Sequence, residues 1–208
     1  MDDQTAVVTR RGETYGGRSR AQRATDRRDR IVASAVHLFG TRDYESITVA
    51  DVCAGARVSK RYFYEHFADR ADLVIAVNRE QNEWLLGNLA TAAPEGATAP
   101  EDVLRLAMRT LVRLLQAYPE RARVIYINAP RMETRRREVL RSDAEFLSRI
   151  LRRTSNHPEE KLRHERTLLA LVAGVSEVII NWISRDMTDD PDLLADHLTR
   201  IGLALLHS

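Results

Sequence analysis

Three helix-start signals lie close together in the first third of the chain, and their spacing constrains the fold more than any other feature. Thr48, Ser59 and Asp69 are residue types that favour the N-cap of a helix. Each has an apolar residue one position before it and another four positions after it, a pattern that fixes how a chain enters a helix. This leaves room for two short helices, over residues 48–56 and 59–66, before a third begins near residue 69. Two helical turns, a bend and two further turns are the outline of a helix-turn-helix.

A longer helix precedes this pair, because apolar residues recur at helical spacing at positions 31, 35, 38 and 39. The bend between the short helices falls on Arg57 and Val58. We therefore expect a three-helix domain over residues 23–70 whose last two helices form the helix-turn-helix. Residues 71–208 are then expected to form a second, larger domain.

Prolines divide the rest of the chain into helices. All six lie beyond residue 93, and Pro100, Pro119, Pro158 and Pro191 are each followed by an acidic residue, which is typical of a first helical turn. No segment alternates apolar and polar residues as a strand would. The sequence thus predicts an all-α protein of about nine helices. The later helices are expected near residues 69–91, 101–117, 120–129, 132–155, 158–186 and 191–206.

Positive charge is concentrated near the N-terminus. Between Arg10 and Arg30 there are eight arginines and three acidic residues, a local charge of +5, whereas the whole chain carries +2. Residues 1–22 have little apolar content, and we expect them to form a flexible basic arm suited to phosphates or a minor groove. A merely solvated tail is the alternative.

The chain has the features of a cytoplasmic protein. Its single cysteine, Cys53, excludes an intramolecular disulfide and any site built from several cysteines. The N-terminus has no signal-peptide pattern, and no stretch reaches about 18 uninterrupted apolar residues. We expect no association with a membrane.

The second short helix carries side chains suited to DNA. In the sequence SKRYFYEHF, Phe63 and Phe67 lie four residues apart and are expected to face inward. Lys60 and Arg61 could donate hydrogen bonds to guanine or phosphate, and the neighbouring tyrosines could contact phosphate or a thymine methyl group. A helical hairpin with solvated basic residues would show the same spacing, so the residues alone leave both interpretations open.

A resemblance to a known family favours DNA binding. The run TVADVCAGARVSKRYFYEHFADRADL, residues 48–73, closely resembles the DNA-binding signature of the tetracycline-repressor (TetR) family of bacterial transcriptional regulators. The matching positions are Thr48, Val49, Asp51, Ala56, Val58, Ser59, Phe63, Tyr64, His66, Phe67 and Leu73.

The resemblance implies a partner, a set of contact residues, and an effector-binding and dimerisation role for residues 71–208. Family regulators act as two-fold dimers whose recognition helices enter successive major grooves, so the expected partner is a double-stranded operator with an inverted repeat. Tyr64 and His66 would lie mainly on phosphates, and Thr48 on the DNA backbone. The residues expected to face DNA are Thr48, Ser59, Lys60, Arg61, Tyr62, Tyr64 and His66.

Three residues depart from the family pattern. Arg57 occupies a turn position where the family usually has glycine, and a left-handed conformation there costs on the order of 1 kcal/mol. Arg57 therefore either re-angles the turn or contributes a phosphate contact. Cys53 stands where alanine is common, and we expect it to be a small core residue. Arg70 stands near the position of a usual lysine.

The last two helices have the apolar patterns of an interface. The stretch from Leu168 to Ile183 is apolar nearly all round, and the last helix has an apolar seam with spacings of 4, 3 and 4. Together they suggest a four-helix homodimer interface, with an internal core of one subunit as the alternative. The candidate interface residues are Val175, Ile179, Trp182, Leu194, Leu198, Ile201 and Leu205.

The middle helices could enclose a small molecule. They carry bulky apolar side chains, with a few amide and carboxylate groups that could orient a ligand. The candidates are Trp84, Met108, Leu111, Leu115, Tyr126, Asn128, Phe146, Val172, Glu177 and Asn181. The set indicates a mainly apolar effector, although an ordinary core explains each residue taken singly.

The sequence contains no recognisable motif of an enzyme active site. The sequence contains no glycine-rich phosphate loop, no H-E-x-x-H, no Cys-x-x-Cys and no serine in a recognisable elbow. We therefore expect no enzymatic activity, metal or cofactor. The predicted function is a ligand-responsive transcriptional regulator, a repressor that an effector releases from its operator. The alternatives are an activator or ligand-independent regulator of the same fold, and a helical ligand-binding or scaffold protein that does not bind DNA.

Overall fold

The computed structural model describes residues 19–92, 99–128, 133–151 and 158–207. Within these ranges the chain forms nine α-helices, a 3₁₀ helix and a short π-helix, and no strand, which confirms the predicted all-α fold. The elements are α1 Arg20–Thr41, η1 Tyr44–Ser46, α2 Val49–Ala56, α3 Lys60–Tyr64, α4 Arg70–Ala92, α5 Pro100–Ala117, α6 Pro119–Arg123, η2 Val124–Asn128, α7 Glu133–Leu151, α8 Pro158–Ser184 and α9 Pro191–Leu206.

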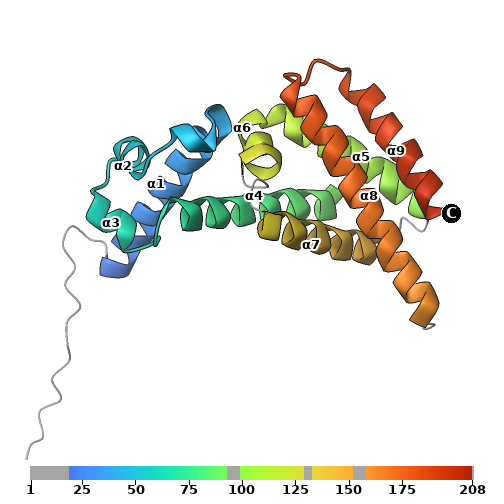
Figure 1. Cartoon of the computed structure of the whole chain (residues 1–208), viewed down its shortest axis with the longest axis horizontal. Coiled ribbons are helices and arrows are strands. Elements are labelled where there is room, and N and C mark those ends of the chain that lie inside the picture. Colours follow the sequence, from blue (N-terminus) through green and yellow to red (C-terminus); the bar gives the residue numbers. More distant parts are fainter. Residues whose placement is uncertain (1–18, 93–98, 129–132, 152–157, 208) are drawn as a thin grey trace, which may run out of the picture.

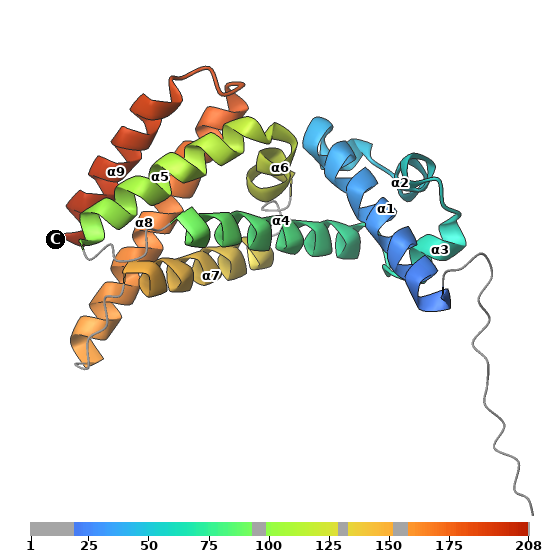
Figure 2. The same ribbon diagram turned by 180° about the vertical axis from the view of Figure 1, so that it is seen from behind.

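The molecule has two parts joined by one long helix. Helices α1, α2 and α3 form one end, α5 to α9 form the other, and α4 runs from the first part into the second (Figures 1 and 2). Near its start α4 buries Leu73 and Val77 in an apolar core shared with α1, α2 and α3. About two turns after Val77, Leu85 is buried in a second core with α5, α7, α8 and α9. A change in the position of α4 therefore affects both cores.

The first core is small and depends on aromatic residues. Ile31, Ala35 and Phe39 of α1 are buried, as the helical spacing predicts, and they pack with Phe63 of α3 and residues of α2 and α4. Cys53 is also buried there, as expected of a small core residue. This core fixes α3 on the outside of the three-helix part.

The second core is built on close helix packing. Helices α5 and α9 lie side by side, with α8 crossing them and α7 beside α4 (Figure 1). At Gly202 of α9, a β-carbon would lie 2.7 Å from the Leu104 side chain, so any larger residue there would force Leu104 of α5 to move. By length and composition α8 could cross a membrane, but Leu168, Leu171 and Ile179 are buried against its neighbours, as in the core helix of a folded domain.

Two of the helix ranges predicted after residue 100 differ from the structure. The helix expected over residues 120–129 is α6 followed by the π-helical turn η2. Asn78 of α4 donates from its amide to the carbonyls of Val124 and Ile125, at 3.3 Å each, which helps to satisfy the wider backbone of this turn. At the other end of the chain, α8 stops at Ser184 because Asp186 and Met187 adopt left-handed conformations.

Candidate DNA-binding surface and ligand cavity

Helix α2 begins with a complete capping box. The Thr48 hydroxyl oxygen accepts a hydrogen bond from the backbone N–H of Asp51 at 3.2 Å, and the Asp51 carboxylate accepts one from the backbone N–H of Thr48 at 2.8 Å. The Thr48 hydroxyl also donates to that carboxylate at 2.6 Å. These bonds, the side-chain one foremost, lower the pKa of Asp51. The carboxylate thus stays charged at the positive end of α2.

The turn after α2 keeps a left-handed conformation without a glycine. Arg57 has φ 54° and ψ 48°, and its N–H donates to the carbonyl of Ala54 at 3.2 Å. The following N–H, of Val58, donates to the carbonyl of Cys53 at 3.0 Å. These bonds are those of a helix C-cap that normally uses glycine. The Arg57 side chain is exposed, so this turn places a cation on the surface just before α3.

Helix α3 is shorter than the sequence predicts. It spans Lys60–Tyr64 instead of 59–66, because the N–H of His66 donates to the carbonyl of Phe63, which tightens the last turn. Ser59 is the N-cap residue, and its hydroxyl makes no cap hydrogen bond. Phe63 and Phe67 face inward as predicted, with ring centroids 5.8 Å apart.

The outer face of α3 is basic and aromatic. Lys60 and Arg61 are exposed, and Arg61 pairs with Glu65 at 3.5 Å across one turn. The Tyr64 side chain is 57% exposed. Tyr62 is held in place, because the Arg27 guanidinium of α1 lies 4.3 Å from its ring centre. The exposed side chains of α3 that could reach DNA are therefore Lys60, Arg61, Tyr62 and Tyr64.

His66 lies differently from the other expected contacts. It is half-buried, and its Nε2 atom is buried without a hydrogen-bond partner among the described residues. A ring nitrogen in that position is turned away from the outer face of α3. Residues 1–18, most of the expected basic arm, lie outside the described residues, whereas residues 19–22 form the N-cap and first turn of α1.

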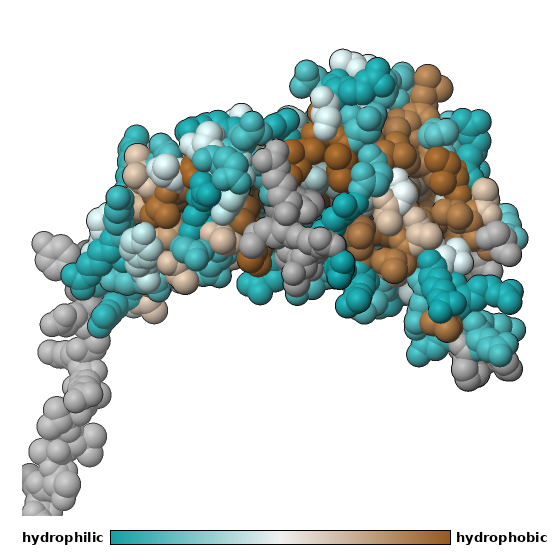
Figure 3. Space-filling view, in the orientation of Figure 1, coloured by the Kyte–Doolittle hydropathy of each residue, from teal (hydrophilic) through white to brown (hydrophobic). Residues whose placement is uncertain are grey.

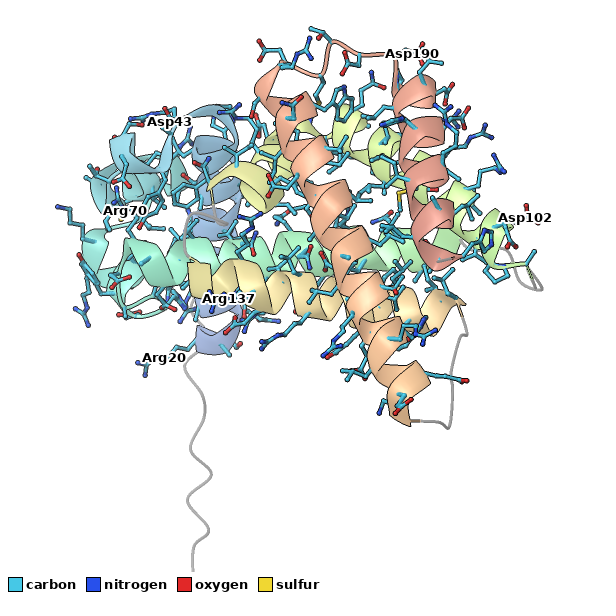
Figure 4. All side chains as sticks on the ribbon, turned by 45° about the vertical axis from the view of Figure 1, so that its right-hand side comes forward. Arg20, Asp43, Arg70, Asp102, Arg137 and Asp190 are labelled. Carbon is cyan, nitrogen blue, oxygen red and sulfur yellow. The ribbon has the colours of Figure 1, made fainter. Side chains whose placement is uncertain are left out.

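Arg70 of α4 holds the segment that connects α1 to α2, a role that the sequence does not reveal. Its guanidinium donates to the carbonyls of Tyr44, at 3.0 Å, and Ile47, and it lies 4.0 Å from the ring centre of Tyr44. Figure 4 labels Arg70 at the start of α4, in the same part of the molecule as Asp43, which directly precedes η1. Because these acceptors are 23 and 26 residues away in sequence, no local pattern could have identified the contact.

A small apolar cavity lies between α4, α5, α7 and α8. Its volume is about 60 Å³, and five of the ten predicted pocket residues line it, namely Met108, Leu111, Tyr126, Phe146 and Val172. A second cavity of about 30 Å³ adjoins the same polar residues. Tyr126, Asp143 and Ser176 line both cavities. Asp143 and Ser176 were missed because only the packing of α7 against α8 brings them here.

The other predicted pocket residues lie elsewhere. Trp84 packs against Tyr118, with ring centroids 5.1 Å apart, and under the Arg121 guanidinium. Leu115 is fully buried in the core without lining either cavity. Glu177 is exposed and pairs with Arg136, and Asn181 is exposed on α8. Helical spacing identified apolar positions correctly but could not say which of them border a cavity.

Asn128 connects the two parts of the molecule instead of binding in the cavity. Its amide nitrogen donates to the carbonyls of Phe39 and, at 3.3 Å, Arg42 at the end of α1. Its oxygen accepts from the backbone N–H of Tyr44 at 3.1 Å. The side chain is buried, and these three hydrogen bonds use both of its N–H donors and its oxygen. Asn128 therefore fixes η2 to the C-terminal end of α1.

The packing favours the internal-core alternative for most of the predicted interface residues. Val175, Ile179, Trp182, Leu194 and Leu198 are buried within the chain itself, and Ile201 and Leu205 are half-buried. Helix α9 turns its apolar seam toward α5, which leaves only Ile201 and Leu205 of this set partly accessible on the surface of the single chain. Apolar surface nevertheless remains on the outside of this part of the molecule, whereas the three-helix part is mostly hydrophilic on the same face (Figure 3).

Known regulators share the sequence and the fold. Residues 31–77, from the middle of α1 into α4, match the model of a family described as bacterial regulatory proteins, tetR family. The HTH-type transcriptional activator FasR of Mycolicibacterium smegmatis is 23% identical over 200 residues, which cover 92% of this chain and 90% of that protein.

Two solved structures have a similar fold over most of the chain. The fatty acid degradation regulator FadR from Bacillus halodurans has a TM-score of 0.70 and 20% identity, covering 84% of this chain and 93% of its own. FadR from Bacillus subtilis in complex with stearoyl-CoA has a TM-score of 0.67 and 17% identity, covering 84% and 97%. The matched family residues build the helix-turn-helix, and these relatives are transcriptional regulators and not enzymes. The helix-turn-helix of this chain, within residues 31–77, thus matches the tetR family of bacterial regulatory proteins, and the chain shares its fold with solved regulators.

Proposed function

We propose that this regulator binds an inverted-repeat operator as a homodimer and acts as a repressor that a small, mainly apolar effector releases. The observation that carries the DNA-binding part is the outer face of α3, where cationic and tyrosine side chains are held outward by a buried aromatic pair. The proposed contacts are Thr48, Arg57, Ser59, Lys60, Arg61, Tyr62 and Tyr64. His66 is half-buried, so we assign it a role in supporting α3 and not a contact with DNA.

Selection of bound fragments from the source genome, followed by fluorescence anisotropy on the selected duplex, tests this proposal. Replacing Arg61 with Ala removes a donor that reaches base edges or phosphate, and we expect affinity to fall by about 1–3 kcal/mol. Arg105→Ala is the matched control, since Arg105 is exposed on α5 in the other part of the molecule. Equal affinities for the two variants would contradict the assignment of α3 as the recognition helix.

The proposed effector site is the cavity between α4, α5, α7 and α8. Its present volume is about 60 Å³, well below the roughly 300 Å³ at which ligand pockets usually start. Binding would therefore push these helices apart. The structural neighbour in complex with stearoyl-CoA supports an apolar effector in this fold.

The π-turn η2 is suited to carry that movement to the DNA-binding end. Within five residues it places Val124 in the first core, Tyr126 at the cavity and Asn128 on the end of α1. A ligand that displaces Tyr126 would therefore shift the end of α1. An effector needs only about 2.7 kcal/mol of differential binding to lower operator affinity 100-fold.

The sign of regulation needs its own measurement, because the M. smegmatis relative is named an activator. In vitro transcription from a promoter that overlaps the selected operator separates the two possibilities. A repressor lowers transcript yield when the protein is added, and transcription returns with the effector. A rise in yield on addition of the protein would instead show an activator of the same fold.

A further inference from the structure

An arginine of α1 covers a tyrosine of α3. Helix α3 lies beside the first turns of α1 (Figures 1 and 2). The guanidinium carbon of Arg27 lies 4.3 Å from the centre of the Tyr62 ring, within the range of a cation–π contact. Tyr62 is 38% exposed, so α1 covers part of its side chain while another part stays open on the surface. Arg27 precedes residues 31–77, so the family match assigns it no role.

Arg27 has a cationic side chain without an ion pair in the described part of the chain. Its Nε atom is buried and makes no hydrogen bond, and no acidic side chain of the described residues pairs with it. The next residue, Arg28, differs, because its guanidinium lies over the ring of Phe67 and pairs with Glu80 of α4. A buried donor without a partner lowers stability, so packing alone does not account for the position of Arg27.

The contact with Arg27 restricts the positions that the Tyr62 ring can adopt. Tyr62 lies on a helix of only five residues, directly before the buried Phe63. The backbone of α3 therefore sets where the side chain starts, and the guanidinium on α1 sets where the ring lies. Tyr64 is supported differently, since its ring meets that of Phe63 edge-on at 5.3 Å. A side chain that is already held in its bound position loses less conformational entropy on binding.

We propose that Arg27 is a positioning residue for DNA recognition, which holds the Tyr62 ring so that its hydroxyl meets one fixed point of the operator. This inference rests on the proposed function, in which Tyr62 contacts DNA. Arg27 acts through Tyr62 and does not itself bind a phosphate. A direct phosphate contact by Arg27 would differ in its salt dependence, because each neutralised phosphate adds to the slope of log affinity against log salt.

A double-mutant cycle on the full chain tests the proposal, with fluorescence anisotropy on the selected operator. Arg27→Gln should weaken operator binding about tenfold in the wild-type background. In the Tyr62→Phe background the hydroxyl contact is already lost, so the same substitution should weaken binding less than about twofold. In the Tyr64→Phe background it should again cost about tenfold, because the Tyr64 ring is supported by Phe63.

Two further variants control for charge and for folding. Arg30→Gln removes an exposed cation from the same helix, and its effect should not depend on Tyr62. Circular dichroism checks that Arg27→Gln is folded. Arg27→Lys keeps the charge and the stem without the planar group, so it serves as a milder variant in the same cycle. Its loss of affinity should be smaller than that of Arg27→Gln and should again disappear in the Tyr62→Phe background.

Equal losses from Arg27→Gln in the wild-type and Tyr62→Phe backgrounds would overturn the proposal, and so would no loss in either. A salt slope that drops by about one unit in Arg27→Gln would show a direct phosphate contact instead. Arg61→Ala on the same duplex separates this inference from the proposed function. If Arg61→Ala weakens binding while Arg27 and Tyr62 show no coupling, the positioning role is rejected and α3 remains the recognition helix.

Discussion

Arginine stands at a position of the helix-turn-helix where the backbone is left-handed, a conformation that favours glycine. At φ 54°, the Arg57 backbone is strained for any side chain with a β-carbon. The structure keeps the turn rather than re-angling it, since both C-cap hydrogen bonds are present. Of the two roles that the sequence left open for Arg57, a re-angled turn is thus not observed, and the phosphate contact stays a proposal.

The variant Arg57→Gly separates strain from DNA contact. Glycine tolerates this conformation, so the free energy of unfolding should rise by about 0.5–1 kcal/mol in urea titrations. If Arg57 contacts phosphate, the operator affinity of the same variant should fall, and the slope of log affinity against log salt should drop by about one unit. A more stable variant with unchanged DNA affinity would show that the arginine has no contact with DNA.

Arg70 departs from the family pattern, and its contacts give it a structural role. Arg70→Lys keeps the charge but loses the planar guanidinium that donates to both carbonyls from a fixed geometry and lies against the ring of Tyr44. We expect the free energy of unfolding to fall by about 1–3 kcal/mol. Arg79→Lys on the same helix is the control, because Arg79 is exposed. Urea unfolding of both variants checks this, and equal midpoints would contradict the role given to Arg70.

At the scale of elements, the N-terminal caps and the apolar faces were predictable, and the connections were not. The capping box at Thr48 and the inward faces of α1 and α3 follow from short-range spacing, which the sequence displays directly. The role of Asn128 depends on partners 84 to 89 residues away, and the π-turn η2 accepts its hydrogen bonds from Asn78, 46 and 47 residues away. The same limit explains why Asp143 was missed as a cavity residue, whereas five apolar ones were found.

The Asp51 cap of α2 should make stability depend on pH. Its pKa is lowered in the folded state, so its stabilising contribution is fully present above the ordinary value of 3.8 and is lost as pH falls through the lower folded value. Asp51→Asn removes this titration. Melting temperatures measured at steps from pH 5 down to pH 3 should therefore decline less steeply for the variant, and parallel curves would show that the cap contributes nothing to the pH dependence.

The junction of η2 and α1 should be sensitive to a change of one atom. Asn128→Asp keeps the oxygen that accepts from Tyr44 but replaces the buried donor with a negative charge beside the carbonyls of Phe39 and Arg42. We expect a loss of about 3 kcal/mol or more in the free energy of unfolding. Asn181→Asp, exposed on α8, is the control. Should the two variants unfold at the same urea concentration, Asn128 would not join the two parts.

At the scale of the whole molecule, the proposed dimer must use surface that remains outside the subunit core. The interface residues chosen from apolar spacing are mostly inside, because apolar spacing marks any buried face and does not distinguish a core from an interface. The outward side of α8 is different. A β-carbon at Gly174 would have nothing within 4 Å in the single chain. Ala170, one turn earlier, is also exposed, so a second subunit could approach α8 closely here.

Gly174→Glu tests whether this side of α8 lies in the dimer. The single chain has room for the side chain, and glutamate favours a helix over glycine, so folding should be undisturbed or slightly improved. A close interface would instead bury a charge without a partner, and light scattering after size-exclusion chromatography should show a monomer with weakened operator binding. Gly87→Glu on α4 is matched, because Gly87 is also exposed with nothing within 4 Å. If both variants remained dimers, the subunits would meet on another face.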